Sequence, residues 1–171
     1  DWIYWKKEET KKFLEKFWFH ELDIEACLED NQNPRIDHYN NYIFITLHFP
    51  KYNKSNKRYY FNEMNFFLMK DRIISLRKFN ENLIDKKFIA FWKKNNELEA
   101  SWEDFKVSSA YILYEILQTM IEKMFKSLDV FSLNLRTFEW QVFDNPTDDL
   151  VREIMIKKRN MLFLKHMIKP Q

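Results

Sequence analysis

A seven-residue repeat of apolar side chains between residues 107 and 142 limits the possible folds more than any other feature of this sequence. Apolar residues recur at two positions of each repeat over about five heptads, which is typical of one continuous α-helix. The first position holds Val107, Tyr114, Ile121, Leu128, Leu135 and Val142, and the second holds Ala110, Leu117, Met124, Phe131 and Phe138. At about 1.5 Å per residue this helix would be about 50 Å long. It would outreach a small domain, so a second helix or neighbouring subunits must cover its apolar side chains.

The segment after this repeat predicts a second long helix that runs back along the first. Asn145 can cap a helix, Pro146 suits its first position, and Asp148 and Asp149 suit the positive end of its dipole. Helical spacing then resumes with Leu150, Ile154, Met161, Leu164 and Ile168, interrupted once by Lys157. We therefore expect a long antiparallel helical hairpin over residues 101–171.

Residues 1–100 have a different pattern and predict an α/β domain. The aromatic residues 1–5 suggest a short strand, and two amphipathic helices follow, with Phe13 and Trp18 among their core side chains. Three strands are expected, at 42–49, 60–69 and 72–77, with a polar loop over 51–57 and a tight turn at 70–71. A further helix is expected at 82–95. The fold class is therefore α/β, with a small mixed or antiparallel sheet and a projecting pair of long helices.

Composition excludes several kinds of chemistry. The 171 residues contain no glycine, whereas phosphate-binding loops and the nucleophile elbow of α/β-hydrolases require it. The 28 basic and 26 acidic residues are mixed along the chain, which argues against a nucleic-acid partner. The single cysteine excludes an intramolecular disulfide and a CxxC zinc site. No apolar run reaches the roughly 18 residues needed to span a bilayer, so we expect a soluble fragment, excised from a longer protein.

The segment from His20 to Leu47 contains the candidate metal ligands. Glu25 and Glu29 lie four residues apart, on one face of a helix, and Asp30 follows, so oxygen ligands for a divalent cation could gather there. A solvated helix face explains the same acids more simply, since cation sites usually need more ligands than two. His20, His38 and His48 belong to separate elements, and nothing in their spacing marks a zinc site or a catalytic triad.

The same segment resembles the cytoplasmic domain of the CorA family of divalent-cation channels. That family has a helix ending in H-x-L-x-x-E-D-x-L, then a proline followed by a basic residue, then an apolar strand led by tyrosine. This chain has His20, Leu22, Glu25 and Leu28, then Pro34–Arg35, then residues 41–45, NYIFI. The segments NEMNFFLMKDRIISLRK, YILYEILQTMIEKMF and IKKRNMLFLKHMIKP are similar to further family segments in the same order. The resemblance covers nearly the whole chain.

The resemblance implies an α/β/α sandwich domain with a projecting helix pair, assembled as a homopentamer below a membrane pore. A stalk helix, two transmembrane helices and a Gly-Met-Asn signature would follow Gln171, so the full-length protein is expected in the cell membrane with this fragment on the cytoplasmic side. The partner would be a divalent metal cation, and the fragment itself would hold no cofactor beyond a weakly bound regulatory Mg²⁺ or other divalent ion.

Two departures from the family bear on the regulatory metal site. Members regulated by magnesium carry Glu-Asp where this chain has Glu25–Ala26, and a further acidic position of the family falls on Gln118. Glu122 retains an acid one turn later. Glu25 and Glu122 are therefore the metal-binding residues that the resemblance implies, in a site that has lost part of its ligand set.

Three functions follow, in descending order of support. The first is the regulatory, ion-sensing domain of a CorA-like transporter that conducts Mg²⁺, Co²⁺, Ni²⁺ or Zn²⁺ passively and is gated through contacts between subunits. The second is a pore-less soluble interaction module that has kept the fold. An enzyme is not expected, and only turnover that depends on His20, Glu25 or His38 would revive that possibility.

Overall fold

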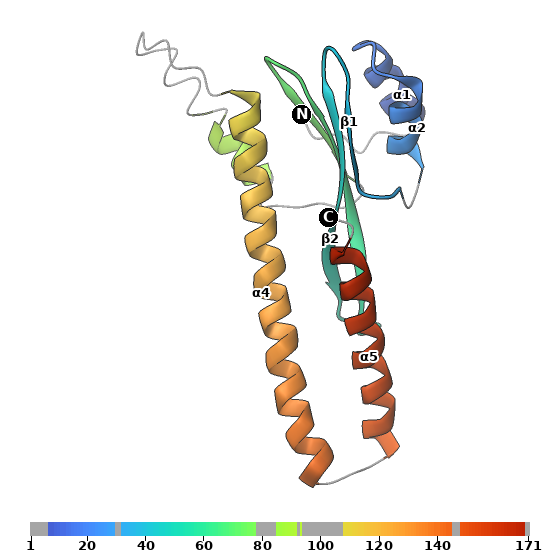
Figure 1. Ribbon diagram of the computed structural model, residues 1–171, viewed down its shortest axis with the longest axis vertical. Helices are drawn as coiled ribbons and strands as arrows, with labels where there is room; N and C mark the ends of the chain where they lie inside the picture. The colour runs from blue at the N-terminus through green and yellow to red at the C-terminus, as the bar shows by residue number, and fades with distance from the viewer. Residues whose placement is uncertain are drawn as a thin grey trace.

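The computed structural model describes residues 7–29, 32–77, 85–91, 93, 108–144 and 148–169. Figure 1 shows the order of the elements along the chain. The helices and strands are α1 (Lys7–Glu15), α2 (Glu21–Leu28), β1 (Arg35–His38), β2 (Ile43–Asn53), β3 (Arg58–Leu68), β4 (Ile73–Arg77), α4 (Ser109–Asp144) and α5 (Asp148–Ile168). Residues 85–91 are also helical. The strand expected at residues 1–5, both ends of the helix expected at 82–95 and the cap at 145–147 lie outside the described residues.

The four strands form one sheet in the order β1-β2-β3-β4, and every neighbouring pair is antiparallel. The sheet is therefore antiparallel, which was one of the two alternatives, and not mixed. The three expected strands are confirmed. β1 was missed because the sequence Arg-Ile-Asp-His contains one apolar residue and gives no strand pattern.

The hairpin between β2 and β3 is longer and tighter than the sequence suggests. Both strands have 11 residues, and pairing continues as far as Asn53 opposite Arg58. The side chain of Asn53 accepts hydrogen bonds from both the backbone and the hydroxyl of Ser55, and Lys57 adopts a positive φ of 54°. Polar residues therefore extend the strands past the expected loop boundary, because pairing with a partner strand outweighs their weak strand preference.

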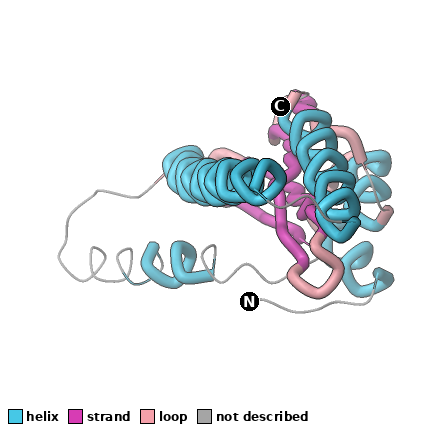
Figure 2. Tube along the Cα trace, turned by 90° about the horizontal axis from the view of Figure 1, so that it is seen from below, coloured by secondary structure: helices cyan, strands magenta, loops and turns pink. Residues whose placement is uncertain are grey.

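Helices cover both faces of the sheet, so the α/β/α arrangement is confirmed. On one face, Leu113, Ile116 and Met120 of α4 pack into a core with strand residues such as Met64 and Phe66. On the other face, α1 and α2 supply Leu14, Phe19, Ile24 and Ala26, which pack against Tyr42, Phe44 and Phe67. In Figures 1 and 2 the sheet separates α4 from α1, α2 and α5. This alternation follows from strand geometry, because successive side chains point to opposite faces.

The two long helices form the projecting antiparallel pair, but the tip of the β2–β3 hairpin lies between them over part of their length (Figure 1). Asn160 of α5 donates a hydrogen bond to the carbonyl of Lys57 (2.9 Å), and the ammonium of Lys57 pairs with Glu153 (3.1 Å). On the other side, the ring of Phe131 in α4 meets Tyr59 edge-on, with 5.8 Å between centroids. The hairpin tip thus covers apolar surface that a simple helical hairpin would cover with its own second helix.

The buried face of α4 differs from the heptad pattern in its first half. Leu113, Ile116 and Met120 are buried, whereas the heptad residues Tyr114 and Ile121 are 58% and 42% exposed. The second half agrees better, since Phe138 is 7% exposed. Both sets have helical spacing, and sequence alone cannot say which of two adjacent apolar stripes meets the sheet.

One expected core aromatic is on the surface. Trp18 is 92% exposed and has a positive φ of 58°, which is unusual for a large side chain. It lies three residues after the end of α1, where the chain turns toward α2. Helical spacing stops at Glu15, so the side chain of Trp18 no longer follows the apolar face that carries Leu14.

Candidate functional site

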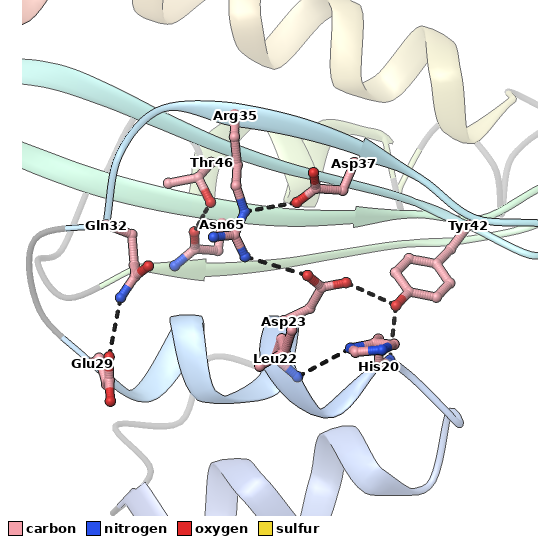
Figure 3. Close-up of polar contacts among 10 residues, drawn as sticks. All are labelled: His20, Leu22, Asp23, Glu29, Gln32, Arg35, Asp37, Tyr42, Thr46 and Asn65. Atoms are coloured by element: carbon pink, nitrogen blue, oxygen red, sulfur yellow. Dashed lines mark hydrogen bonds and ion pairs between the residues drawn. The ribbon is translucent and has the colours of Figure 1, made fainter.

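A network of polar side chains is buried between α2 and the sheet (Figure 3). Asp23 of α2 is fully buried and accepts a hydrogen bond from the hydroxyl of Tyr42 (2.8 Å). The guanidinium of Arg35 lies 3.4 Å from the other oxygen of Asp23. The oxygen of Tyr42 in turn accepts from the backbone N–H of His20 (2.8 Å). Charged and neutral hydrogen bonds therefore tie helix α2 to β1, through Arg35, and to Tyr42, the residue that precedes β2.

The start of α2 explains why this network forms here. His20 precedes the helix, and its Nδ1 atom accepts from the backbone N–H of Leu22 (3.2 Å), as an N-cap does. Glu21 and Asp23 fill the first turn, where negative charge is favourable. Burial raises the pKa of the Tyr42 phenol, and the Asp23 carboxylate raises it further. The phenol therefore stays a hydrogen-bond donor to Asp23 at neutral pH.

A second part of the network joins β2 to β3. The hydroxyl of Thr46 donates to Asn65 (2.8 Å), and the amide of Asn65 donates to Glu63 (3.2 Å). The other oxygen of Glu63 accepts from the backbone N–H of Gln32 (3.0 Å) and lies 3.8 Å from Nε2 of His48. These strand residues are all buried. Through Gln32, which follows α2, these strand residues also hold the end of the α2 segment against the sheet.

Cys27 lies beside this network, on the inner side of α2. Burial raises the pKa of its thiol, and the negative charges of Asp23 and Glu63 raise it further. Cys27 is half-buried and packs against the aromatic core. A thiol that stays protonated at neutral pH is a poor nucleophile and a poor metal ligand. Cys27 is thus a packing residue.

The two implied metal-binding residues are exposed and belong to opposite sides of the sheet. Glu25 lies on the outer face of α2, while Ala26 beside it is buried in the core. Glu122 lies on the outer face of α4 and accepts a hydrogen bond from the amide of Gln118 (3.2 Å). Because the sheet separates α2 from α4 (Figure 1), Glu25 and Glu122 of one chain do not share an ion.

The structure does not assemble a metal site from the other candidates either. Among the described residues, no group of three or more His, Cys, Asp or Glu side chains is placed to hold a metal ion. His20 caps α2 and stacks on Tyr39, and His48 is buried against Phe61. The metal-binding roles of Glu25 and Glu122 stay predictions.

Sequence reasoning missed the residues that organise this region. Asp23, Arg35 and Tyr42 are placed together only by the fold, since Asp23 is 12 residues from Arg35 and 19 from Tyr42. One signal was available: an aspartate in the first turn of a helix, at a position that its apolar neighbours mark as buried, needs a partner.

Comparison with known proteins agrees with this fold and identifies the family of the chain. The sequence profile of the family described as CorA-like Mg2+ transporter protein matches residues 1–171. The chain belongs to the CorA-like Mg²⁺ transporter family. The resemblance inferred from the sequence motifs is therefore confirmed over the whole chain.

Two curated relatives support the assignment. The cobalt/magnesium transport protein CorA of Thermotoga maritima is 24% identical over 157 residues, which are 91% of this chain and 43% of that protein. The putative metal ion transporter YfjQ of Bacillus subtilis is 25% identical over 162 residues, 95% of this chain and 47% of that protein. The chain spans less than half the length of these relatives.

Solved structures have the same fold. The soluble domain of CorA from Methanocaldococcus jannaschii matches with a TM-score of 0.67 at 14% identity, covering 96% of this chain and 63% of that one. The full-length CmaX protein matches with a TM-score of 0.68 at 17% identity, covering 96% of this chain and 48% of that one. The structural match places this CorA-like chain in the fold of a transporter's soluble domain. Within the part of the chain that the structure describes, no helix is both long and apolar enough to cross a bilayer.

Proposed function

We propose that this chain is the cytoplasmic regulatory domain of a CorA-like transporter, which conducts a divalent metal cation passively and opens or closes through contacts between subunits. The observation that carries the proposal is the family match over residues 1–171, together with a fold that matches the soluble domain of an archaeal CorA. The pore would lie in the remainder of the protein. The full-length protein would be a homopentamer in the cell membrane with this domain on the cytoplasmic side.

The buried network supports a mechanical role. Asp23, Arg35 and Tyr42 fix α2 to the sheet. A force applied to the outer face of α2 would therefore move the sheet, together with the helices that cover its two faces, as one unit. A rigid domain of this kind transmits a change at one subunit interface to another. Conformational regulation requires that a ligand bind two states with different affinity.

The exposed carboxylates determine the affinity for a divalent cation that we expect of this chain. Glu25 and Glu122 each offer one carboxylate, and the neighbouring positions hold Ala26 and Gln118. Two carboxylates that lie far apart in one chain make a poor divalent site. Calorimetry on the 171-residue chain should therefore detect only weak Mg²⁺ binding, and a submillimolar site would contradict this view.

Transport tests the proposal directly. The gene should be read through the codon for Gln171 and its product reconstituted in vesicles that contain a Mg²⁺-sensitive dye. We expect cation influx that follows the electrochemical gradient without ATP. A stop codon shortly after Gln171, or vesicles that stay impermeable to Mg²⁺, Co²⁺, Ni²⁺ and Zn²⁺, would rule the proposal out.

A pore-less interaction module is the second candidate function. It is favoured by large apolar side chains that are exposed on the long helices, among them Leu133 (65%) and Trp140 (73%). Cell fractionation without detergent separates the two functions, since a pore-less protein would be recovered in the soluble fraction and a channel in the membrane pellet.

A further inference from the structure

A small cavity lies where the tip of the β2–β3 hairpin meets the two long helices (Figure 1). Its volume is about 130 Å³. The hairpin, α4 and α5 each contribute residues to its wall, among them Tyr52 and Tyr59, Val130 and Phe131, and Ile156 and Lys157. No residue of the buried network under α2 lines this cavity, so it is a separate feature of the molecule.

One wall of the cavity is aromatic. The ring of Tyr59 lies 4.9 Å from the ring of Tyr52 and meets Phe131 edge-on, with 5.8 Å between centroids. Burial raises the pKa of the Tyr59 phenol, and the neighbouring Tyr52 raises it further, so this wall is uncharged at neutral pH. Aromatic rings pack favourably edge-on or offset. The wall therefore suits one more ring.

The hairpin backbone beside the cavity already has its hydrogen-bond partners. Asn160 of α5 is 4% exposed; its amide donates to the carbonyl of Lys57 (2.9 Å), and its side-chain oxygen accepts from the backbone N–H of Tyr59 (3.5 Å). A ligand does not have to satisfy these backbone groups, because they are paired within the protein. The inner part of the cavity therefore favours an apolar group.

Lys157 gives the cavity a positive charge. This residue interrupts the apolar spacing of α5, and its ammonium lies over the ring of Phe138, 5.1 Å from the centroid. An aromatic ring attracts an ammonium but does not neutralise its charge. The other lysine of the cavity, Lys57, is paired with Glu153 (3.1 Å). Two lysines and one glutamate leave the lining with an excess of one positive charge, which complements an anionic group.

The volume of the cavity limits the size of its ligand. Sites for drug-sized molecules usually measure about 300–1,000 Å³, whereas an apolar cavity of about 150 Å³ holds one benzene ring. We propose that this cavity binds a small monocyclic carboxylate, with its ring beside Tyr59 and Phe131 and its carboxylate at Lys157. The site is formed within one chain, so the inference does not depend on the proposed function.

Such a ligand would contact the hairpin tip, α4 and α5 at once. A molecule that binds only the folded arrangement stabilises that arrangement by mass action. The ligand would therefore hold the two long helices against the hairpin tip. The arrangement of the helix pair would then depend on the concentration of a small organic acid.

Titration of the isotopically labelled 171-residue chain with sodium benzoate, followed by NMR, tests the site. We expect saturable shifts of the backbone amides of Tyr59, Phe131 and Lys157, with a Kd on the order of 1 mM for so small a ligand. Acetate has the charge without the ring, and benzyl alcohol has the ring without the charge. Each should bind at least about fivefold more weakly than benzoate. The absence of saturable shifts up to about 20 mM benzoate, or equal binding of acetate, would overturn the inference.

Variants of α5 identify the group that recognises the carboxylate. Lys157→Gln should weaken benzoate binding about fivefold and leave the binding of benzyl alcohol as it was, while Lys157→Arg keeps the charge and should keep the affinity within about twofold. Lys158→Gln is the matched control, because Lys158 is the next residue, is exposed and does not line the cavity. The amide spectrum of each variant also shows whether it is folded. Equal effects of Lys157→Gln and Lys158→Gln on benzoate binding would contradict the assigned role of Lys157.

Discussion

The two faces of the sheet are held by different kinds of interaction. On the α4 face the core is almost wholly apolar, and Ile116 and Met64 are fully buried. On the α2 face an aromatic core surrounds a buried charge, Asp23, that is held by Tyr42 and Arg35. Apolar packing tolerates small shifts, whereas hydrogen bonds to a buried charge fix distance and direction. We therefore expect that α4 can shift slightly against the sheet, whereas the position of α2 on the sheet is fixed.

The largest expected effect is on the apolar face. Ile116→Ala should lower the free energy of unfolding by about 3 kcal/mol, because a cavity remains under α4 where the side chain was fully buried. The matched control is Ile121→Ala on the same helix, where exposure is 42% and a change within about 0.5 kcal/mol is expected. Urea denaturation measures both. A larger loss for Ile121→Ala than for Ile116→Ala would mean that the heptad positions, and not the observed face, pack on the sheet.

Removal of the buried charge should come next. Asp23→Ala leaves the buried Tyr42 hydroxyl without its acceptor, whereas Arg35 keeps its ion pair with Asp37 (2.7 Å). We expect a loss of about 2 kcal/mol in the free energy of unfolding. Asp71, whose ion pair with Arg72 is exposed, is the control, and Asp71→Ala should leave the urea midpoint as it was. If Asp23→Ala were as mild as the control, the α2 face would be held by its aromatic residues alone.

The smallest expected effect has the opposite sign. Asn62 lies opposite Phe49 on the α4 face and is 1% exposed, and among the described residues neither polar atom of its side chain has a hydrogen-bond partner. Asn62→Leu should therefore stabilise the protein by about 1 kcal/mol, because it removes an unsatisfied amide from an apolar core. Thermal unfolding measures this change. A clear destabilisation would show that the amide is satisfied, for example by buried water, and that the α4 face also depends on polar contacts.

Much of the fold could be predicted from sequence because its elements have strong local patterns. Helix α4, strands β2, β3 and β4 and the turn at Lys70–Asp71 all follow from periodicity and turn residues, and the motifs around Glu25 and Pro34 identified the family. β1 and Trp18 were missed, because a four-residue edge strand and a chain reversal after α1 leave no periodic signal. The candidate site was harder to predict from the sequence. Glu25 and Glu122 were inferred by resemblance, and the fold places them on opposite sides of the sheet.

The sequence by itself determined the long helices, the three longer strands and the family that the chain resembles. It also excluded the functions that need glycine-rich loops, because the chain contains no glycine. Only the tertiary structure decided which stripe of α4 meets the sheet and which partner neutralises Asp23. The physical reason is range: helical and strand periodicity are set by neighbours a few residues away, whereas the choice between two apolar stripes, and the pairing of Asp23 with Arg35 and Tyr42, depend on residues brought together by folding.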